Sequence, residues 1–157
     1  MRGLVLASCL LLIAAPVVRA QSDSTKKPQA ALQWGPAPPV FPKGAQMAVV
    51  SGNPSQEGPF ELQLSFPSGY KIAPHFHPTE ETVEVKQGTF LVGMGDKLDV
   101  KKTTAMKKGD HGTIPAEHHH YAIAKGKTVV DVKSTGPFAM TYVNPEDTPT
   151  DARQSQP

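Results

Sequence analysis

The sequence predicts an all-β fold in which antiparallel strands form a sandwich or barrel. Residues 60–66 (FELQLSF) alternate strictly between apolar and polar side chains, as expected of a strand with one buried face. Short apolar runs separated by Gly and Pro continue along most of the remaining chain. Because no amphipathic helix of three turns is visible in the sequence, a fold of alternating strands and helices is disfavoured.

Each apolar run between two turn signals is interpreted as one strand. A chain of 157 residues has room for one domain built from such strands. Residues 99–106 are the only segment in which a short helical turn is expected. In addition to 60–66, strands are predicted at 47–51, 70–77, 81–86, 89–94, 113–114, 118–124, 128–133 and 138–143.

Residues 1–20 have the composition of a secretory signal peptide. Arg2 provides a positive start, residues 3–18 are almost wholly apolar, and Val18-Arg19-Ala20 places small residues where a signal peptidase reads them. A membrane anchor is disfavoured because the apolar run is shorter than the roughly 20 residues that a spanning helix needs. Lipidation at Cys9 is also disfavoured, since the apolar run continues well past that residue. We therefore expect cleavage after residue 20 and a periplasmic or secreted protein.

Removal of the signal peptide changes the charge balance and the cysteine content. The full chain has 16 basic and 14 acidic residues, and Arg2 and Arg19 leave with the signal, so 14 of each remain. A neutral mature chain gives no support for a nucleic-acid partner or an anionic membrane surface. The only cysteine also leaves, which excludes a disulfide or a catalytic thiol. The mature protein must therefore be held together by its core, or by its core and a metal ion.

Composition divides the mature chain into three parts. Residues 21–33 are mostly polar and rich in Lys and Ser, so we expect a disordered lead-in there. Residues 34–145 hold all of the predicted strands and form a single domain. Residues 146–157 have no apolar side chain larger than Ala152, so a flexible tail is expected.

The domain begins with a proline-rich arm at residues 34–43. Its four prolines favour an extended, polyproline-like conformation. One interpretation of such a segment is a recognition ligand for another protein. We favour instead an arm laid across the domain, with Trp34 and Phe41 as its anchors.

All six histidines lie between residues 75 and 120, in two clusters. The first cluster is on the predicted strand 70–77. In a strand, residues two apart point to the same side. His75 and His77 can therefore present two imidazoles to one point, with Phe76 on the opposite face.

The next predicted strand carries an acidic residue on its apolar face. Glu81 shares that face with Val83 and Val85, whereas the residues between them are polar. The apolar face must point into the core, so Glu81 points inward as well. A buried carboxylate is costly unless a positive charge meets it. A metal ion on His75 and His77 would supply that charge.

His118, His119 and His120 form the second cluster. Such a run can be solvated and have no function, but Pro115 closes a turn before it and the chain continues as a strand after it. Alternation sends His119 to the face opposite the other two, and does not separate His118 from His120. The position of His118 in the turn after Pro115 favours His120, which begins the strand.

Two ordered sets of residues resemble the two sequence motifs of the cupin superfamily, and in particular its small exported single-domain members. The first set matches the family motif at every position: Gly69, His75, His77, Glu81 and Gly88. The second set, in the same order and spacing as the family motif, is Gly109, Pro115 and His120. The second motif also selects His120 among the three consecutive histidines.

The second motif departs from the family pattern at two positions. Glu117 stands where the family usually has Gly, and Ala124 stands where it usually has Asn. Both are turn or packing positions, so the departures bear on local loop shape rather than on metal ligation. Further resemblance lies outside the motifs, at 34–36, 51–54, 58–60, 136–138 and 142–145.

The resemblance implies an antiparallel double-stranded β-helix, or jelly-roll barrel, with one metal site. The family's ligand positions correspond to His75, His77, Glu81 and His120. Three imidazoles and one carboxylate suit a divalent transition metal such as Mn, Fe, Ni, Zn or Cu. They fit Ca or Mg poorly, since those ions prefer oxygen donors. The alternative is a cupin that works without metal, which the complete ligand set disfavours.

The resemblance also implies a homodimer and a small-molecule ligand or substrate. Cupins of this kind commonly pair through their sheets, and the proline-rich arm offers an extended segment to exchange. If His120 points inward, Tyr121 and Ile123 fall on the outward face, which is a second reason to expect a partner there.

Three functions remain open at this point. The first is a small-molecule enzyme with dioxygenase-, isomerase- or decarboxylase-type chemistry, for which the small residues Ala73, Ala122 and Ala124 would leave space beside the ion. The second is a module that binds or senses a metal or small ligand without turnover. The third is a metal that only stabilises the barrel. Analogy with the family favours the enzyme.

A general acid or base beside the metal would separate an enzyme from a binding module. The sequence offers several ionisable residues but places none of them in the pocket, so no catalytic residue is assigned. Each candidate is more typical of an exposed polar residue. The candidates are Tyr70, Glu80, His111 and His118.

Overall fold

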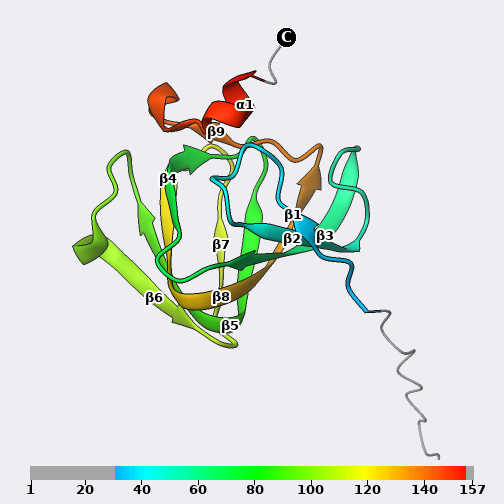
Figure 1. Ribbon diagram of the computed structural model, residues 1–157, viewed down its shortest axis with the longest axis horizontal. Coiled ribbons are helices and arrows are strands. Elements are labelled where there is room, and N and C mark those ends of the chain that lie inside the picture. Colours follow the sequence, from blue (N-terminus) through cyan, green and yellow to red (C-terminus); the bar gives the residue numbers. More distant parts are fainter. Residues whose placement is uncertain (1–30, 155–157) are drawn as a thin grey trace, which may run out of the picture. The chain divides into compact units, whose positions relative to one another are not determined.

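The computed structural model describes residues 31–154 and shows an all-β domain (Figure 1). The strands are β1 (Gly35–Pro36), β2 (Gln46–Ser51), β3 (Gly58–Phe66), β4 (Lys71–Phe76), β5 (Glu81–Met94), β6 (Thr103–Lys107), β7 (His111–Ile114), β8 (His120–Gly136) and β9 (Thr141–Tyr142). Three short helical segments accompany them: η1 (Val100–Lys102), η2 (Pro145–Asp147) and α1 (Thr150–Gln154). The predicted all-β fold is confirmed.

The predicted signal peptide at residues 1–20, and all but the last residues of the predicted lead-in, lie outside the described residues. Among residues 31–154, no helix is long and apolar enough to cross a membrane. The tail expected to be flexible contains η2 and α1 within its described part, and Figure 1 shows both beside β9.

Every strand pairing is antiparallel, and two long strands organise the sheet. The first part of β8, residues 120–123, pairs with β4, whereas residues 128–136 pair with β3. On its other side β8 pairs with β5 along most of its length. The strands β6 and β7 continue the sheet beyond β5. Because β5 and β8 bend, the sheet curls into a jelly-roll barrel (Figure 1).

The structure has one continuous strand at β5 and one at β8 where the sequence predicts two each. The register between them shifts on either side of Gln87, and Gly88 has a φ of 81°. A Cβ at Gly88 would lie 2.4 Å from the carbonyl oxygen of Lys127. Only glycine accepts both that backbone angle and that close approach, so the expected break is a bulge that bends the strand. Residues 99–106, expected to be a helical turn, contain η1 and then most of β6.

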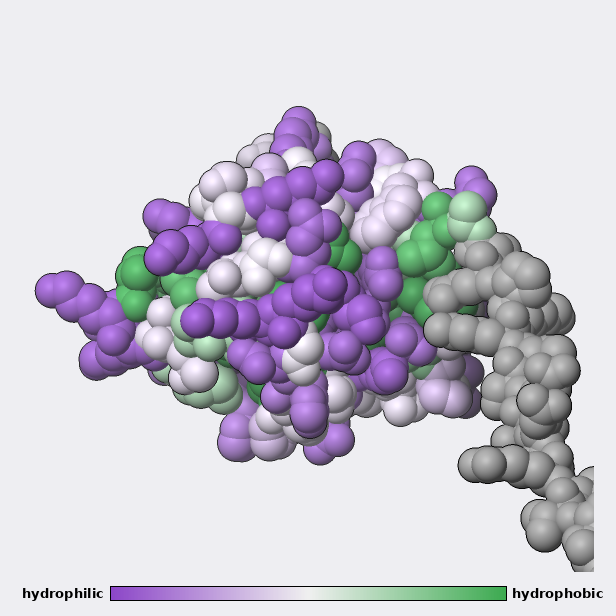
Figure 2. All heavy atoms as spheres, turned by 90° about the horizontal axis from the view of Figure 1, so that it is seen from below, coloured by the Kyte–Doolittle hydropathy of each residue, from purple (hydrophilic) through white to green (hydrophobic). Residues whose placement is uncertain are grey.

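One apolar core fills the interior of the domain. The alternation in β3 is confirmed, because Phe60, Leu62, Leu64 and Phe66 are each at most 5% exposed. Buried valines from β5 and β8 pack against them. Figure 2 shows the contrast on one face of the surface, where hydrophilic side chains cover most of the area and hydrophobic areas are small and separate.

The proline-rich arm lies across the domain, as expected, but with one anchor rather than two. Phe41 is buried and stacks on Phe138 with ring centroids 6.1 Å apart. Trp34, the other expected anchor, is 41% exposed. It precedes β1, which pairs only with β2 at the edge of the sheet, so little of the domain lies over its ring.

Two tyrosines hold the backbone of the arm from beneath. The hydroxyl of Tyr70 donates to the carbonyl oxygen of Pro42 at 2.5 Å, and that of Tyr142 donates to the carbonyl oxygen of Val40 at 2.8 Å. Burial raises the pKa of both phenols, so each remains a hydrogen-bond donor at neutral pH. The arm is thus fixed to β9 and to the start of β4.

Tyr121 and Ile123 lie on the face of β8 opposite His120, but they are not free to meet a partner. Tyr121 is 0% exposed and Ile123 is 7% exposed. The ring of Tyr121 lies over Gly93 of β5, and its hydroxyl donates to the carbonyl oxygen of Asp99 at 2.9 Å. The connection between β5 and β6 therefore covers this face within one chain, and the expectation that these two residues favour a dimer was wrong.

Candidate metal centre

Pairing between β4 and β8 brings two of the histidines together. His75 stands directly opposite His120 in the antiparallel register. The register shifts between Ile72 and His75, so that Ile72, Pro74 and His75 are all buried. This irregularity turns the imidazole of His75 into the interior without removing Ile72 from the core. His77 follows directly after β4 and is buried too.

Glu81 reaches the same place from β5. It is the first residue of that strand and is 8% exposed, and the alternation continues inward with Val83 and Val85. One carboxylate oxygen of Glu81 lies 3.5 Å from Nε2 of His77, and the other lies 3.3 Å from Nε2 of His120. The ligand atoms of the three histidines lie within 4.8 Å of one another. The structure thus brings together all four residues proposed from the sequence.

The second nitrogen of each histidine is already committed to the backbone. Nδ1 of His75 bonds the carbonyl oxygen of Ala73 at 2.8 Å, Nδ1 of His77 that of Ala139 at 2.7 Å, and Nδ1 of His120 that of His118 at 2.9 Å. A carbonyl oxygen only accepts, so each Nδ1 carries the proton. In the neutral ring this leaves the lone pair on Nε2, which is the arrangement of metal-binding histidines.

One buried atom at this centre has no hydrogen bond. Nε2 of His120 is inaccessible to solvent and makes no hydrogen bond to any described residue, although Glu81 lies near it. A buried polar atom without a partner is costly, so something is expected to meet it. Three imidazole nitrogens and one carboxylate form a donor set that a divalent transition metal accepts. The residues present therefore fit a metal ion.

The pKa values at the centre favour the same protonation states. Burial and repulsion from the neighbouring His120 and His77 lower the pKa of His75 to about 3, so its ring is neutral at physiological pH. Burial by itself raises the pKa of Glu81, but the adjacent imidazoles outweigh it and the pKa is lowered overall. A neutral His75 ring and an ionised Glu81 carboxylate are the forms that bind a cation.

The loop before β8 has Glu117 where the family motif usually has glycine, and its backbone still adopts the conformation that favours glycine. Glu117 adopts a φ of 62°, in the left-handed region that glycine occupies most easily. Its N–H donates to the carbonyl oxygen of His77 at 2.8 Å. The loop is thus held against the first cluster, and ligation does not depend on a glycine there.

Sequence reasoning missed the aromatic residues that pack on the candidate ligands His75 and His77. The ring of Phe138 is 5.4 Å from that of His77, and the ring of Tyr142 is 6.2 Å from that of His75, centroid to centroid. The carbonyl of Ala139, between them in sequence, holds His77. These contacts join residues about 60 positions apart, and the only signal in the sequence was the resemblance around 136–138 and 142–145.

The other ionisable candidates lie away from the four converging side chains. Glu80, His111 and His118 are exposed. Tyr70 is buried, but its hydroxyl is committed to the arm. His119 points to the other face of β8, where Nδ1 lies 2.6 Å from a carboxylate oxygen of Asp96. A general acid or base other than the ligands is not found among the described residues of the centre.

Comparison with protein-family models and with curated proteins finds no match. Solved structures, in contrast, are similar in fold. The polyketide cyclase RemF from Streptomyces resistomycificus is 16% identical, with a TM-score of 0.57 over 71% of this chain and 80% of that chain. A recombinant oxalate oxidase in complex with glycolate is 20% identical, with a TM-score of 0.50 over 69% of this chain and 60% of that chain.

A third similar structure is an RmlC-like cupin from Shewanella frigidimarina. It is 17% identical, with a TM-score of 0.50 over 59% of this chain and 76% of that chain. At such identities a likeness establishes architecture rather than activity. The antiparallel order of the strands and the curled sheet agree with it. This chain is therefore a cupin by fold.

Proposed function

We propose that this protein binds one divalent transition metal ion through His75, His77, Glu81 and His120. The observation that carries the proposal is the set of three histidines whose Nδ1 atoms are all held by carbonyls, leaving three Nε2 lone pairs to converge beside one carboxylate. Mn, Fe, Ni, Zn and Cu are all compatible with these donors. Glu81 supplies one negative charge, and the carbonyls fix the rings.

We further propose that the metal serves chemistry on a small molecule, of oxygenase or isomerase type. A bound divalent ion supplies Lewis acidity, and four protein donors leave up to two octahedral positions open. The chain's own residues hold the ring nitrogens, keep Glu81 ionised and exclude bulk water with apolar neighbours. The names of two similar structures, a polyketide cyclase and an oxalate oxidase, are consistent with small-molecule chemistry on this fold.

A non-catalytic module that binds a metal or small ligand is the second candidate. The observation that favours it is the lack of a further acid or base beside the ligands among the described residues. Tyr142 is the polar side chain packed on His75, and its hydroxyl is committed to Val40. Chemistry at this site would have to use the metal ion and its own ligands for proton transfer.

The experiment is elemental analysis of the purified protein, followed by oxygen-uptake screening with small molecules. One equivalent of a transition metal per chain supports the metal proposal, and its loss in His120→Ala with retention in His119→Ala supports the ligand set. A metal content near zero under every loading condition contradicts it. Oxygen uptake that depends on the metal separates an oxygenase from a binding module.

Export and dimerisation belong to the same proposal. The composition of residues 1–20 supports export to the periplasm or the medium, and the test is mass spectrometry of the mature chain, which should begin at Gln21. The resemblance and the edge position of β1 support a homodimer. Light scattering at micromolar concentration tests it, and a monomer there contradicts it.

A further inference from the structure

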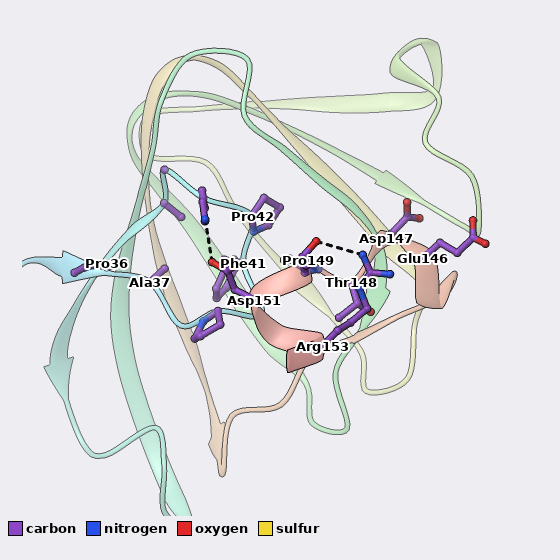
Figure 3. Close-up of a pocket in the computed structure, with 15 residues that line it drawn as sticks. Pro36, Ala37, Phe41, Pro42, Glu146, Asp147, Thr148, Pro149, Asp151 and Arg153 are labelled. Atoms are coloured by element: carbon purple, nitrogen blue, oxygen red, sulfur yellow. Dashed lines mark hydrogen bonds and ion pairs between the residues drawn. The ribbon is translucent and has the colours of Figure 1, made fainter. Parts of the chain in front are cut away.

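The arm and the tail enclose a cleft outside the metal centre. It consists of two adjoining cavities of about 830 and 470 Å³ that share Pro39 and Thr148 as walls. Figure 3 shows the larger cavity, with residues of the arm on one side and residues 146–153 on the other. Both volumes fall in the range of small-molecule sites in proteins.

The larger cavity has charged residues at its rim. Lys43 of the arm pairs with Asp151 of α1 at 3.2 Å, and this ion pair joins the two walls. Glu146, Asp147 and Arg153 also line this cavity. This outer part of the cleft is therefore polar, and its charges are partly compensated within the protein.

The smaller cavity is apolar and has no charged residue in its lining. Its only polar side chains are two threonines and one tyrosine, and the hydroxyl of that tyrosine, Tyr142, is already donated to the backbone of Val40. The lining residues are Pro38, Pro39, Val40, Met140, Thr141, Tyr142, Pro145, Thr148 and Ala152. A charged ligand would lose its hydration here without gaining a partner. An uncharged, mainly apolar molecule would lose little.

One side chain contacts both this apolar cavity and the candidate metal centre. Tyr142 lines the cavity, and its ring centroid is 6.2 Å from that of His75. All four residues proposed as metal ligands are at most 8% exposed, so a molecule has to pass a covering element to reach them. The cavity therefore adjoins the metal centre at Tyr142.

We propose that the apolar cavity between the arm and the tail is the site at which an uncharged, ring-sized small molecule binds next to the metal, with Tyr142 as the partition between them. The proposal rests on the proposed function for its use of the metal, and it names the substrate class of that centre. The observation that carries it is an uncharged cavity whose lining includes Tyr142, the residue whose ring packs on His75.

The test is fluorine NMR with two matched probes, 4-fluorobenzyl alcohol and 4-fluorobenzoate, which share a ring and differ in charge. We expect the alcohol to bind the zinc-loaded protein at least tenfold more tightly than the benzoate. We also expect its resonance to broaden further when paramagnetic cobalt replaces zinc, because the cavity adjoins the metal centre. Equal binding of the two probes overturns the proposal, and so does a lack of added broadening in protein that elemental analysis shows to hold cobalt.

A pair of alanine substitutions locates the site. Ala152→Phe fills the apolar cavity and should weaken binding of the alcohol at least tenfold. Ala116→Phe adds the same ring at an exposed position outside the cavity lining, on the loop whose Glu117 N–H donates to the carbonyl of His77, and should leave binding unchanged. Loss of binding in Ala116→Phe with retention in Ala152→Phe moves the site to that loop and overturns the proposal.

Metal content and melting temperature, measured on both variants, distinguish this proposal from the metal proposal. If the alcohol binds the wild-type cavity but the protein takes up no metal, the metal assignment fails and the cavity remains a binding site. If the protein holds one metal ion and the alcohol does not bind, the cavity assignment fails and the metal assignment stands. If Ala152→Phe does not fold, the comparison of zinc and cobalt in the wild-type protein still tests whether the alcohol binds beside the metal.

Discussion

The two faces of β5 and β8 carry two clusters of ionisable side chains that differ in how their charge is compensated. On the inner face Glu81 meets three imidazoles. On the outer face Glu84 and Asp131 meet Lys86, whose Nζ lies 3.0 Å from one carboxylate and 3.2 Å from the other. In the outer cluster each carboxylate has a lysine as its partner, although Oδ1 of Asp131 is buried without a hydrogen bond.

The inner cluster lacks such a cation. Within residues 31–154 no lysine or arginine pairs with Glu81, and its neighbours include His75, whose pKa of about 3 keeps it neutral. On the outer face the hydrogen bond from Lys86 lowers the pKa of Glu84 without any metal. The difference teaches that a buried carboxylate without a lysine or arginine partner, rather than any carboxylate, distinguishes the candidate metal centre.

Removal of the metal should have the largest effect. Glu81 would lose the cation proposed to meet it, whereas the outer cluster would be unchanged. Linkage predicts a loss of about 4 kcal/mol when the free metal concentration had been about 1,000 times the Kd. The melting temperature should then fall by roughly 10 °C or more. Calorimetry of chelator-treated and reloaded protein measures it, and equal melting temperatures would place the metal elsewhere.

Alanine substitution of each of the three consecutive histidines tests which of them binds the metal. His120→Ala should lose most of the bound metal, because its Nε2 faces Glu81. His118→Ala and His119→Ala should keep close to one ion per chain, since the first is exposed and the second points to the opposite face. Elemental analysis of all three variants decides it. Retention in His120→Ala with loss in His118→Ala would shift the register by two residues.

A matched pair of carboxamide substitutions compares the two faces directly. Glu81→Gln removes the negative charge of the inner cluster and should weaken metal binding more than about 100-fold. Substitution of a residue that only orients a ligand typically weakens metal binding by about 10- to 100-fold. Glu84→Gln makes the same change three residues later, on the outer face, and should leave metal affinity unchanged. Competition with a chelating dye measures both affinities. Similar losses in the two variants would refute the contrast between the faces.

The pH dependence of the metal-free protein follows from the lowered pKa of His75. Folded His75 takes up a proton near pH 3, whereas the unfolded chain takes it up near pH 6.5. The free energy of unfolding should therefore fall as the pH is lowered from about 6.5, by up to about 1.4 kcal/mol per pH unit for this group. The lowered pKa of Glu81 adds a loss of the same sign below about pH 4.5. Urea denaturation between pH 7 and 5 would contradict this if stability stayed constant.

Much of this centre was predictable because strand alternation and motif spacing are local properties. The inward direction of Glu81 followed from its parity with Val83 and Val85, and all three are buried. The bulge between Ile72 and His75 was not predictable, since the change of register depends on the pairing of β4 with β8. The same limit explains why the break expected at Gly88 is a bend within one strand.

The contacts that orient the candidate ligands could not be predicted from the sequence either. His77 is fixed by the carbonyl of Ala139, 62 residues away, and no local pattern reports such a pairing. For Tyr121, the prediction that its side chain points to the face opposite His120 was right. The expectation that it is exposed there was wrong, because it is 0% exposed. Parity gives the face of a strand, but what covers that face depends on the connection between β5 and β6, which places Asp99 over the ring.

The smallest effect is expected for the cation of the outer cluster. Lys86→Met removes the partner of Glu84 and Asp131, and the side chain of Lys86 is 41% exposed, so water replaces much of what it provided. We expect a loss of about 1 kcal/mol or less in the free energy of unfolding, and a smaller loss at high salt because mobile ions screen the pair. Metal content should not change. Urea denaturation at low and high salt, with elemental analysis of the same samples, measures both quantities. Metal loss in Lys86→Met would mean that the outer network supports the inner centre, and the two faces could no longer be treated as independent.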